Sequence, residues 1–121
     1  MGKVDKLGAF EQRVLAAVVA LGEDAFGLAI YDKLCEWEED PNHGSMYVTL
    51  DRLEKKGYLI SAYSLPMAER GGQPRKYFRA KPEGARVLRE SLEMSKRVSD
   101  GIPDSMWTLI RGAIRIPTRF K

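Results

Sequence analysis

The residues best suited to chemistry in this sequence are the cations of one short loop. The stretch AERGGQPRKYFRA, from Ala68 to Ala80, carries its positive charges around a Gly-Gly pair and a proline. Glycine tolerates positive φ and proline fixes φ without donating an N–H, so the loop is expected to be a tight turn. A turn of this kind presents cations to phosphate oxygens, although a solvated hairpin tip is the alternative. The predicted phosphate-contacting residues are Arg70, Gly71, Gly72, Gln73, Arg75 and Lys76.

A second group of candidate contact residues lies in the segment from residue 43 to 57. At about 100° per residue, Met46, Leu50 and Leu53 form the inward face of a helix. One flank of this helix holds Ser45, Thr49, Arg52 and Lys56, and the other holds Tyr47, Asp51 and Glu54. Hydroxyl and guanidinium groups can contact base edges and phosphate, so the first flank is predicted to meet DNA. An exposed helix face without a partner is the alternative.

Catalytic and metal-binding chemistry is not expected. One histidine, His43, and one cysteine, Cys35, form neither a disulfide nor a usual zinc site, and no nucleophile–base pair can be assembled. We therefore expect no enzyme and no cofactor, and assign His43 to the start of a helix and Cys35 to the core. Trp37 and Trp107 could stack on a small aromatic effector, although buried packing is the commoner role of tryptophan.

Length and composition favour one compact globular chain. The protein has 121 residues, of which 44% are hydrophobic and 31% charged. No run approaches the roughly 20 apolar residues of a membrane span, and no secretory signal is recognised, so a cytoplasmic location is expected. The net charge of +3 is uneven: residues 1–69 hold 7 Lys+Arg against 12 Asp+Glu, and residues 70–121 hold 13 against 5. The basic second part suggests a polyanionic partner, with scattered solvated cations as the alternative.

The candidate residues must be positioned by a small set of helices and one hairpin. Apolar spacing and turn residues predict helices over residues 7–22, 26–40 and 43–57, two strands within 58–65 and 76–80, and helices over 81–101 and 104–115. This order predicts a mainly α fold with a small β-hairpin, namely a winged helix-turn-helix. We assign residues 1–81 to a DNA-binding domain and residues 82–121 to a helical dimerisation region.

The expected long fourth helix carries more apolar surface than one small core can bury. Beyond the stripe of Ala85, Leu88 and Leu92 runs a second apolar line, which is predicted to meet a second copy of the chain. The residues of that line are Val87, Met94, Val98 and Ile102. The basic, amphipathic tail of residues 102–121 is expected to pack on the partner subunit, and an anionic membrane surface is the alternative.

Two segments together resemble the PadR family of winged-helix transcriptional regulators. They are GSMYVTLDRLEKKGYL and ERGGQPRKYFRAKPEG, and the resemblance extends from about Leu7 to Val98. It implies that the third helix enters the major groove, the wing approaches the DNA backbone or minor groove, and the C-terminal helix forms a dimer. The helix residues to which it gives this role are Ser45, Tyr47, Thr49 and Arg52, and the wing residues are those from Arg70 to Lys76.

We therefore expect a homodimeric, sequence-specific DNA-binding regulator, in particular a repressor that occludes a promoter. The alternative is a winged-helix module that docks a protein partner instead of DNA. Salt-dependent binding to duplex DNA distinguishes these two functions, because only the first displaces counterions from phosphates.

Overall fold

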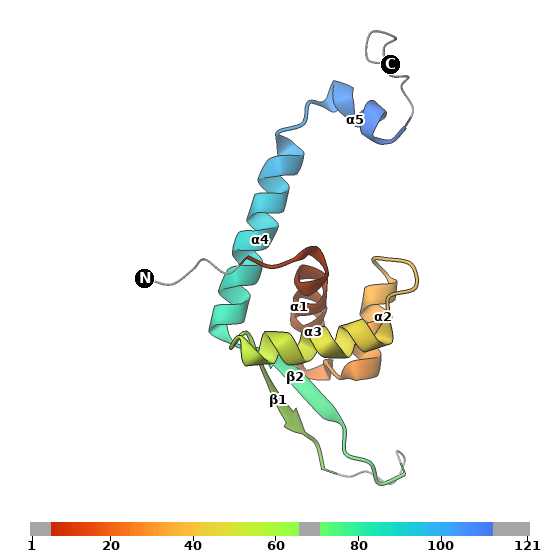
Figure 1. The fold of residues 1–121 in the computed structure, drawn as a ribbon, viewed down its shortest axis with the longest axis vertical. Helices are drawn as coiled ribbons and strands as arrows, with labels where there is room; N and C mark the ends of the chain where they lie inside the picture. The colour runs from red at the N-terminus through yellow and green to blue at the C-terminus, as the bar shows by residue number, and fades with distance from the viewer. Residues whose placement is uncertain (1–5, 66–70, 113–121) are drawn as a thin grey trace. The chain divides into compact units, whose positions relative to one another are not determined.

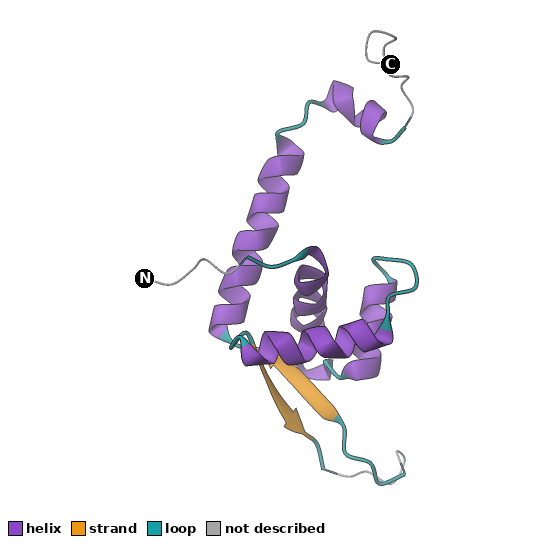
Figure 2. Cartoon of the chain, viewed as in Figure 1, coloured by secondary structure: helices purple, strands orange, loops and turns teal. Residues whose placement is uncertain are grey.

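The computed structural model describes residues 6–65 and 71–112 (Figures 1 and 2). Its elements follow the predicted order. They are α1 (Ala9–Leu21), the short 3-10 helix η1 (Gly22–Asp24), α2 (Gly27–Cys35), α3 (His43–Lys55), β1 (Leu59–Tyr63), β2 (Lys76–Ala80), α4 (Pro82–Asp100) and α5 (Asp104–Ile110). By its internal contacts the chain divides into two compact units, Met1–Ser91 and Leu92–Lys121.

The core of the first unit is built on α1. Val14, Leu15 and Val18 repeat at helical spacing and are fully buried, so α1 turns one apolar face inward. Gly22 ends the helix with a φ of 59°, where its N–H reaches the carbonyls of Val18 and Val19. Glycine suits this position because other residues rarely adopt positive φ. The end of α1 therefore turns the chain toward α2.

The turn between α2 and α3 differs from the expectation. The predicted second helix ran to Asp40, but α2 ends at Cys35 and an acidic loop follows. Asp40 has a φ of 48°, which no continuing α-helix allows. Asn42 then caps α3 as predicted, because its side-chain oxygen accepts the Ser45 N–H at 2.8 Å.

The hairpin is joined to the helical core at its base. β1 and β2 pair antiparallel from Leu59–Ala80 to Tyr63–Lys76, and alternation turns the side chains of Leu59 and Phe78 into the core. The N–H of Phe78 donates to the Ala25 carbonyl at 2.8 Å, and Phe26 forms a single bridge with Tyr77. The segment before α2 thus acts as a short third strand beside β2.

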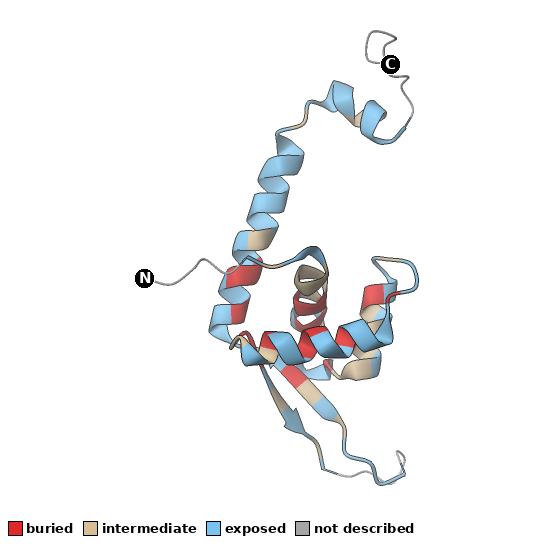
Figure 3. Cartoon of the chain, viewed as in Figure 1, coloured by how far each residue is buried: buried red, intermediate tan, exposed pale blue. Residues whose placement is uncertain are grey.

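The first part of α4 belongs to the core of the first unit (Figure 3). Gly84 lies so close to the Tyr58 carbonyl that a Cβ would overlap with it. Val87 is only 5% exposed, so its assignment to an exposed dimer line was wrong: the winged-helix core covers it. Leu88 is buried as expected, whereas Ala85 and Leu92 are exposed.

The second unit consists of the end of α4 and the short helix α5 within its described residues. Its large apolar side chains have little cover within the chain. Those exposed by a third or more are Leu92, Met94, Val98, Met106, Leu109 and Ile110. Over residues 6–65 and 71–112, no helix combines the length and apolar character that crossing a membrane requires.

Candidate nucleic-acid interface

The helix α3 presents one continuous exposed face. Met46, Leu50 and Leu53 are buried, so the residues about half a turn away point outward. We call these residues the outer face of α3: Gly44, Ser45, Tyr47, Val48, Asp51, Arg52 and Lys55, all of which are exposed. The face is chemically mixed, with a hydroxyl, a phenol, an apolar side chain and charges of both signs.

One edge of α3 packs against the start of α1, which corrects two predicted contact residues. Thr49 is only 4% exposed, so its hydroxyl lies inside the fold. The ammonium of Lys56 pairs with the Glu11 carboxylate at 3.0 Å, and both side chains are largely covered. Helical periodicity had placed these residues on the same flank as Ser45 and Arg52, but α1 covers that side of α3. Ser45 and Arg52 remain exposed, at the margin of a hollow of about 630 Å³ beside α1.

Glu11 combines two stabilising contacts at this edge. Its carboxylate accepts the N–H of Gly8 at 2.9 Å and a hydrogen bond from Lys56. Burial raises the pKa of the Glu11 carboxyl, but these hydrogen bonds and the positive charges of Lys56 and Arg52 outweigh burial and lower it overall. Glu11 is therefore held in its ionised form at the start of α1, where a negative charge also favours the helix dipole.

The other edge of α3 contacts the hairpin and the start of α2. The carboxylate of Glu54 accepts a hydrogen bond from the Ser61 hydroxyl at 2.7 Å, which ties α3 to β1. The phenol of Tyr47 lies against Gly27, yet the ring stays exposed. Tyr47 therefore lies at the margin of the outer face, next to α2.

Four residues of the outer face were absent from the predicted contact set, namely Gly44, Val48, Asp51 and Lys55. Val48 is 57% exposed, and Lys55 pairs with Asp51 at 3.0 Å on the same surface. The prediction followed a flank of the helix instead of the side opposite the core. Counting half a turn from the buried positions Met46, Leu50 and Leu53 would have identified all four residues from the sequence.

The wing places its cations differently along its length. The guanidinium of Arg75 lies 3.8 Å from the centre of the Phe26 ring, and Phe26 in turn meets Tyr77 edge-on at 5.6 Å. Such stacking holds the planar group in one orientation and leaves its N–H edges able to donate. Lys76 is exposed and points toward the rings of Tyr63 and Phe78 at 5.7 and 5.5 Å.

The wing tip has the expected backbone conformation where it is described. Gly71 and Gly72 both have positive φ, at 66° and 80°, as the predicted turn requires. Gln73 is exposed. Arg70 lies outside the described residues, as do the tail cations Arg115, Arg119 and Lys121.

The histidine, cysteine and tryptophans have the following environments. His43 begins α3, as predicted, and its ring stacks on Tyr31 at 3.6 Å. Cys35 is exposed, so its assignment to the core was wrong; it lies at the last position of α2, beyond the buried Leu34. Burial together with the nearby Cys35 raises the pKa of Tyr31. Trp37 is exposed in the acidic loop between α2 and α3.

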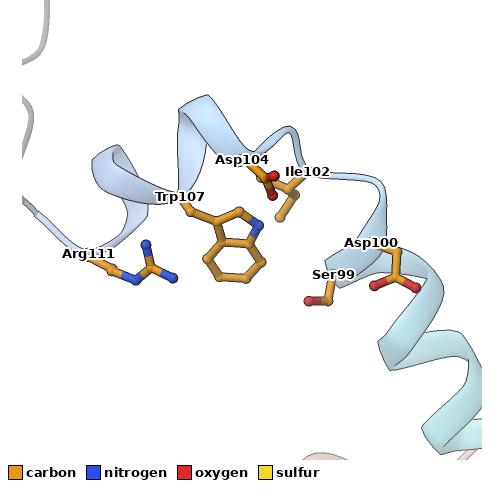
Figure 4. A pocket seen from close by; sticks show the side chains of 6 residues that line it. All are labelled: Ser99, Asp100, Ile102, Asp104, Trp107 and Arg111. Carbon is orange, nitrogen blue, oxygen red and sulfur yellow. The ribbon is translucent and has the colours of Figure 1, made fainter.

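Trp107 lines a shallow hollow of about 330 Å³ within the second unit (Figure 4). Its indole lies beside the guanidinium of Arg111 at 5.6 Å, and Ile102 and Asp104 line the same hollow. Neither tryptophan is fully buried, which differs from the commoner role considered above. Among the described residues, no three histidine, cysteine, aspartate or glutamate side chains gather as metal ligands do.

Comparisons with known proteins agree on the fold. Residues 14–90 match the family described as the transcriptional regulator PadR-like family. A PadR family transcription regulator from hypervirulent Clostridium difficile R20291 has 22% identity and a TM-score of 0.66, covering 84% of this chain and 99% of its own. A PadR family regulator from Eggerthella lenta DSM 2243 has 31% identity and a TM-score of 0.59, covering 76% and 82%.

A more distant solved structure has the same fold. FabT from Streptococcus pneumoniae, crystallised in complex with DNA, has 14% identity and a TM-score of 0.57, covering 88% of this chain and 69% of that one. Curated protein sequences provide no match.

Proposed function

Because this chain belongs to the transcriptional regulator PadR-like family, we propose that it regulates transcription by binding double-stranded DNA through the outer face of α3 and the wing. We further propose that it is a cytoplasmic homodimer that represses transcription by occluding a promoter. The observation that carries DNA binding is the arrangement of α3: its apolar face is buried, while its opposite face is exposed and carries groups that can meet base edges. The DNA complex of FabT supports the use of this fold on a duplex.

The two parts of the proposed interface have different tasks. Ser45, Tyr47 and Arg52 on α3 would contact base edges and adjacent phosphates, whereas the wing would contact the DNA backbone. The wing residues in this proposal are Arg70, Gly71, Gly72, Gln73, Arg75 and Lys76. Thr49 is left out of the contact set because it is buried, and Lys56 because it is paired with Glu11.

The homodimer proposal rests on the uncovered end of α4. Met94 and Val98 are exposed and fall on the same helical stripe as the buried Val87, so a stripe that begins in the core continues without cover. A two-fold mate that buried Met94, Val98 and Ile102 would complete this stripe. A dimer would also place two reading helices on one operator, whose half-sites would then be related by the same symmetry.

A small aromatic effector is a further part of the proposal. Trp107, with Arg111 beside it, lines an open hollow, and an indole face can stack on a flat ring. With Trp37→Phe as the background, Trp107 is the one remaining indole, and quenching of its fluorescence by planar aromatic compounds tests this part. Unchanged fluorescence across such a set would exclude stacking on Trp107.

DNA binding is tested by sequencing the fragments that the purified chain retains, followed by titration of that operator and a scrambled duplex at several salt concentrations. Arg52→Ala should weaken operator binding by about 1 to 3 kcal/mol and relax sequence preference. Arg89→Ala removes an equal charge from α4 and serves as the matched control. If no duplex is bound in a salt-dependent manner, the chain is instead a protein-docking module.

A further inference from the structure

Val48 is the apolar side chain at the middle of the outer face of α3. It is 57% exposed and lies about half a turn from the buried Met46 and Leu50. Single exposed apolar residues are common on protein surfaces and need no explanation by themselves. Val48 differs in its position, because in the proposed DNA complex the middle of the outer face of α3 would come nearest to the floor of the groove.

Among the described residues of α3, no bulky side chain lies next to Val48 on its N-terminal side. Side chains of a helix lean toward its N-terminus, so the Val48 methyl groups lie over the turn that contains Gly44. Gly44 has no side chain, and the nearest atom to a Cβ built there would be the Asn42 side-chain oxygen at 3.3 Å. A base edge can therefore approach the Val48 methyl groups without meeting a bulky neighbour.

Asp51 makes its own side of Val48 less favourable for a phosphate than the side of the exposed Arg52. Asp51 lies three residues further on the same face, and its carboxylate pairs with Lys55 at 3.0 Å. The Asp51 carboxylate repels phosphate. The Lys55 ammonium, which neutralises it, is already engaged in this ion pair. The middle of the outer face is thus less suited to the backbone than the wing, where Arg75 and Lys76 lie.

From these observations we propose that Val48 is a specificity-determining residue that recognises the 5-methyl group of a thymine in the operator. The inference rests on the proposed DNA binding. Valine can neither donate nor accept a hydrogen bond, so it reads a base through apolar contact alone. In the major groove, the one apolar group among the four bases is the thymine methyl, and adenine, guanine and cytosine expose polar edges. The stiff, β-branched side chain loses little rotamer freedom in this contact.

The test uses the full chain and the operator obtained from retained fragments. Each thymine is replaced singly by deoxyuridine, which removes the methyl group and keeps the Watson–Crick edge. At one thymine in each half-site, wild-type affinity should fall by about fourfold, the effect of uncovering roughly one buried methyl group. Val48→Ala should weaken binding to the thymine operator by a similar factor and should bind both forms equally.

Val19→Ala is the matched control, because it removes the same atoms from an exposed position on α1. It should keep the full preference for thymine over deoxyuridine. Preserved preference in Val48→Ala, or no sensitive thymine in a wild type that still binds its operator specifically, overturns the role of Val48 and leaves DNA binding intact. Failure of the wild type to bind any duplex overturns both proposals.

Discussion

The phenol hydroxyl of Tyr47 occupies the space beside Gly27 that a Cβ at that position would need. The first turn of α2 and the exposed ring on α3 therefore fit together only because residue 27 is glycine. The atom in the way is the far end of a side chain, so a substitution at Gly27 would move Tyr47 more easily than it would move the backbone.

Gly27→Ala should alter binding more than folding. In the wild-type background it should displace Tyr47 and weaken operator binding at least threefold, an effect of about 0.7 kcal/mol or more. Unfolding free energy should change by less than about 1 kcal/mol, because alanine is the better helix former and offsets part of the clash. In a Tyr47→Ala background, where the clash is absent, the same substitution should stabilise the chain. Denaturant titration of the four variants measures this difference, and an equal effect in both backgrounds would contradict it.

Because Arg75 stacks on Phe26, the effect of its charge on DNA binding can be separated from the effect of the orientation of its guanidinium. Arg75→Lys keeps the charge, so the dependence of log affinity on log salt should be retained while operator binding weakens. Arg75→Ala should reduce that slope by about one unit. Phe26→Leu keeps apolar volume and removes the ring, so Arg75→Ala should cost less affinity in that background. Lys76→Ala is the control, because its effect on the salt dependence of binding should be the same in both backgrounds. If Arg75→Ala costs the same operator affinity with and without the Phe26 ring, the stack does not contribute to binding.

Glu11 should make the free energy of unfolding depend on pH in the acidic range. Its folded-state pKa lies below the ordinary value of 4.5, so ionised Glu11 stabilises the fold above that value, and this contribution is lost as the pH falls through the lowered folded pKa. Glu11→Gln should reduce the unfolding free energy by about 1 kcal/mol at about pH 7, through loss of the charged cap and the Lys56 pair. The difference should shrink progressively below about pH 4.5. Denaturant titrations across this pH range measure the difference in unfolding free energy, and the substitution Glu93→Gln at an exposed position is the control. A difference that does not change with pH would mean that the shape of the Glu11 side chain, and not its charge, is responsible.

The exposed end of α4 should determine whether the chain is a monomer or a dimer in solution. Sedimentation at micromolar concentration should give about twice the monomer mass for the wild type and the monomer mass for Val98→Glu, because a buried unpaired charge is unfavourable at an apolar interface. Leu28→Glu is matched in exposure, at 59% against 61% for Val98, and should leave the dimer unchanged. A monomeric wild type, or a dimeric Val98→Glu, would contradict the proposed interface.

The sequence was most informative where the signal is local. The Asn42 cap, the Gly71–Gly72 turn and the α/β order depend on neighbouring residues, and each was predicted from spacing and residue type. Periodicity also identified the buried line of Met46, Leu50 and Leu53. Helical faces and turns could therefore be assigned without knowledge of tertiary contacts.

Where an assignment depended on which element covers a face, the sequence could not decide it. Thr49 and Lys56 share a flank with Ser45 and Arg52, but the start of α1 covers only part of that flank. Val87 and Val98 share a stripe of α4, and the core covers only the first of them. These differences arise from contacts between residues far apart in the chain, which helical periodicity does not encode.

The bridge between Phe26 and Tyr77 and the Phe78 N–H bond to the Ala25 carbonyl join the start of α2 to the base of the wing, so we expect these two parts to open together. The Phe78 amide should therefore exchange with deuterium only through an opening that also releases the first turn of α2. It follows that the base of the wing is already ordered before any ligand arrives, and its residues lose little conformational entropy on association. A substitution in the first turn of α2 would consequently be detectable in β2 as faster amide exchange, even where it leaves the wing sequence untouched.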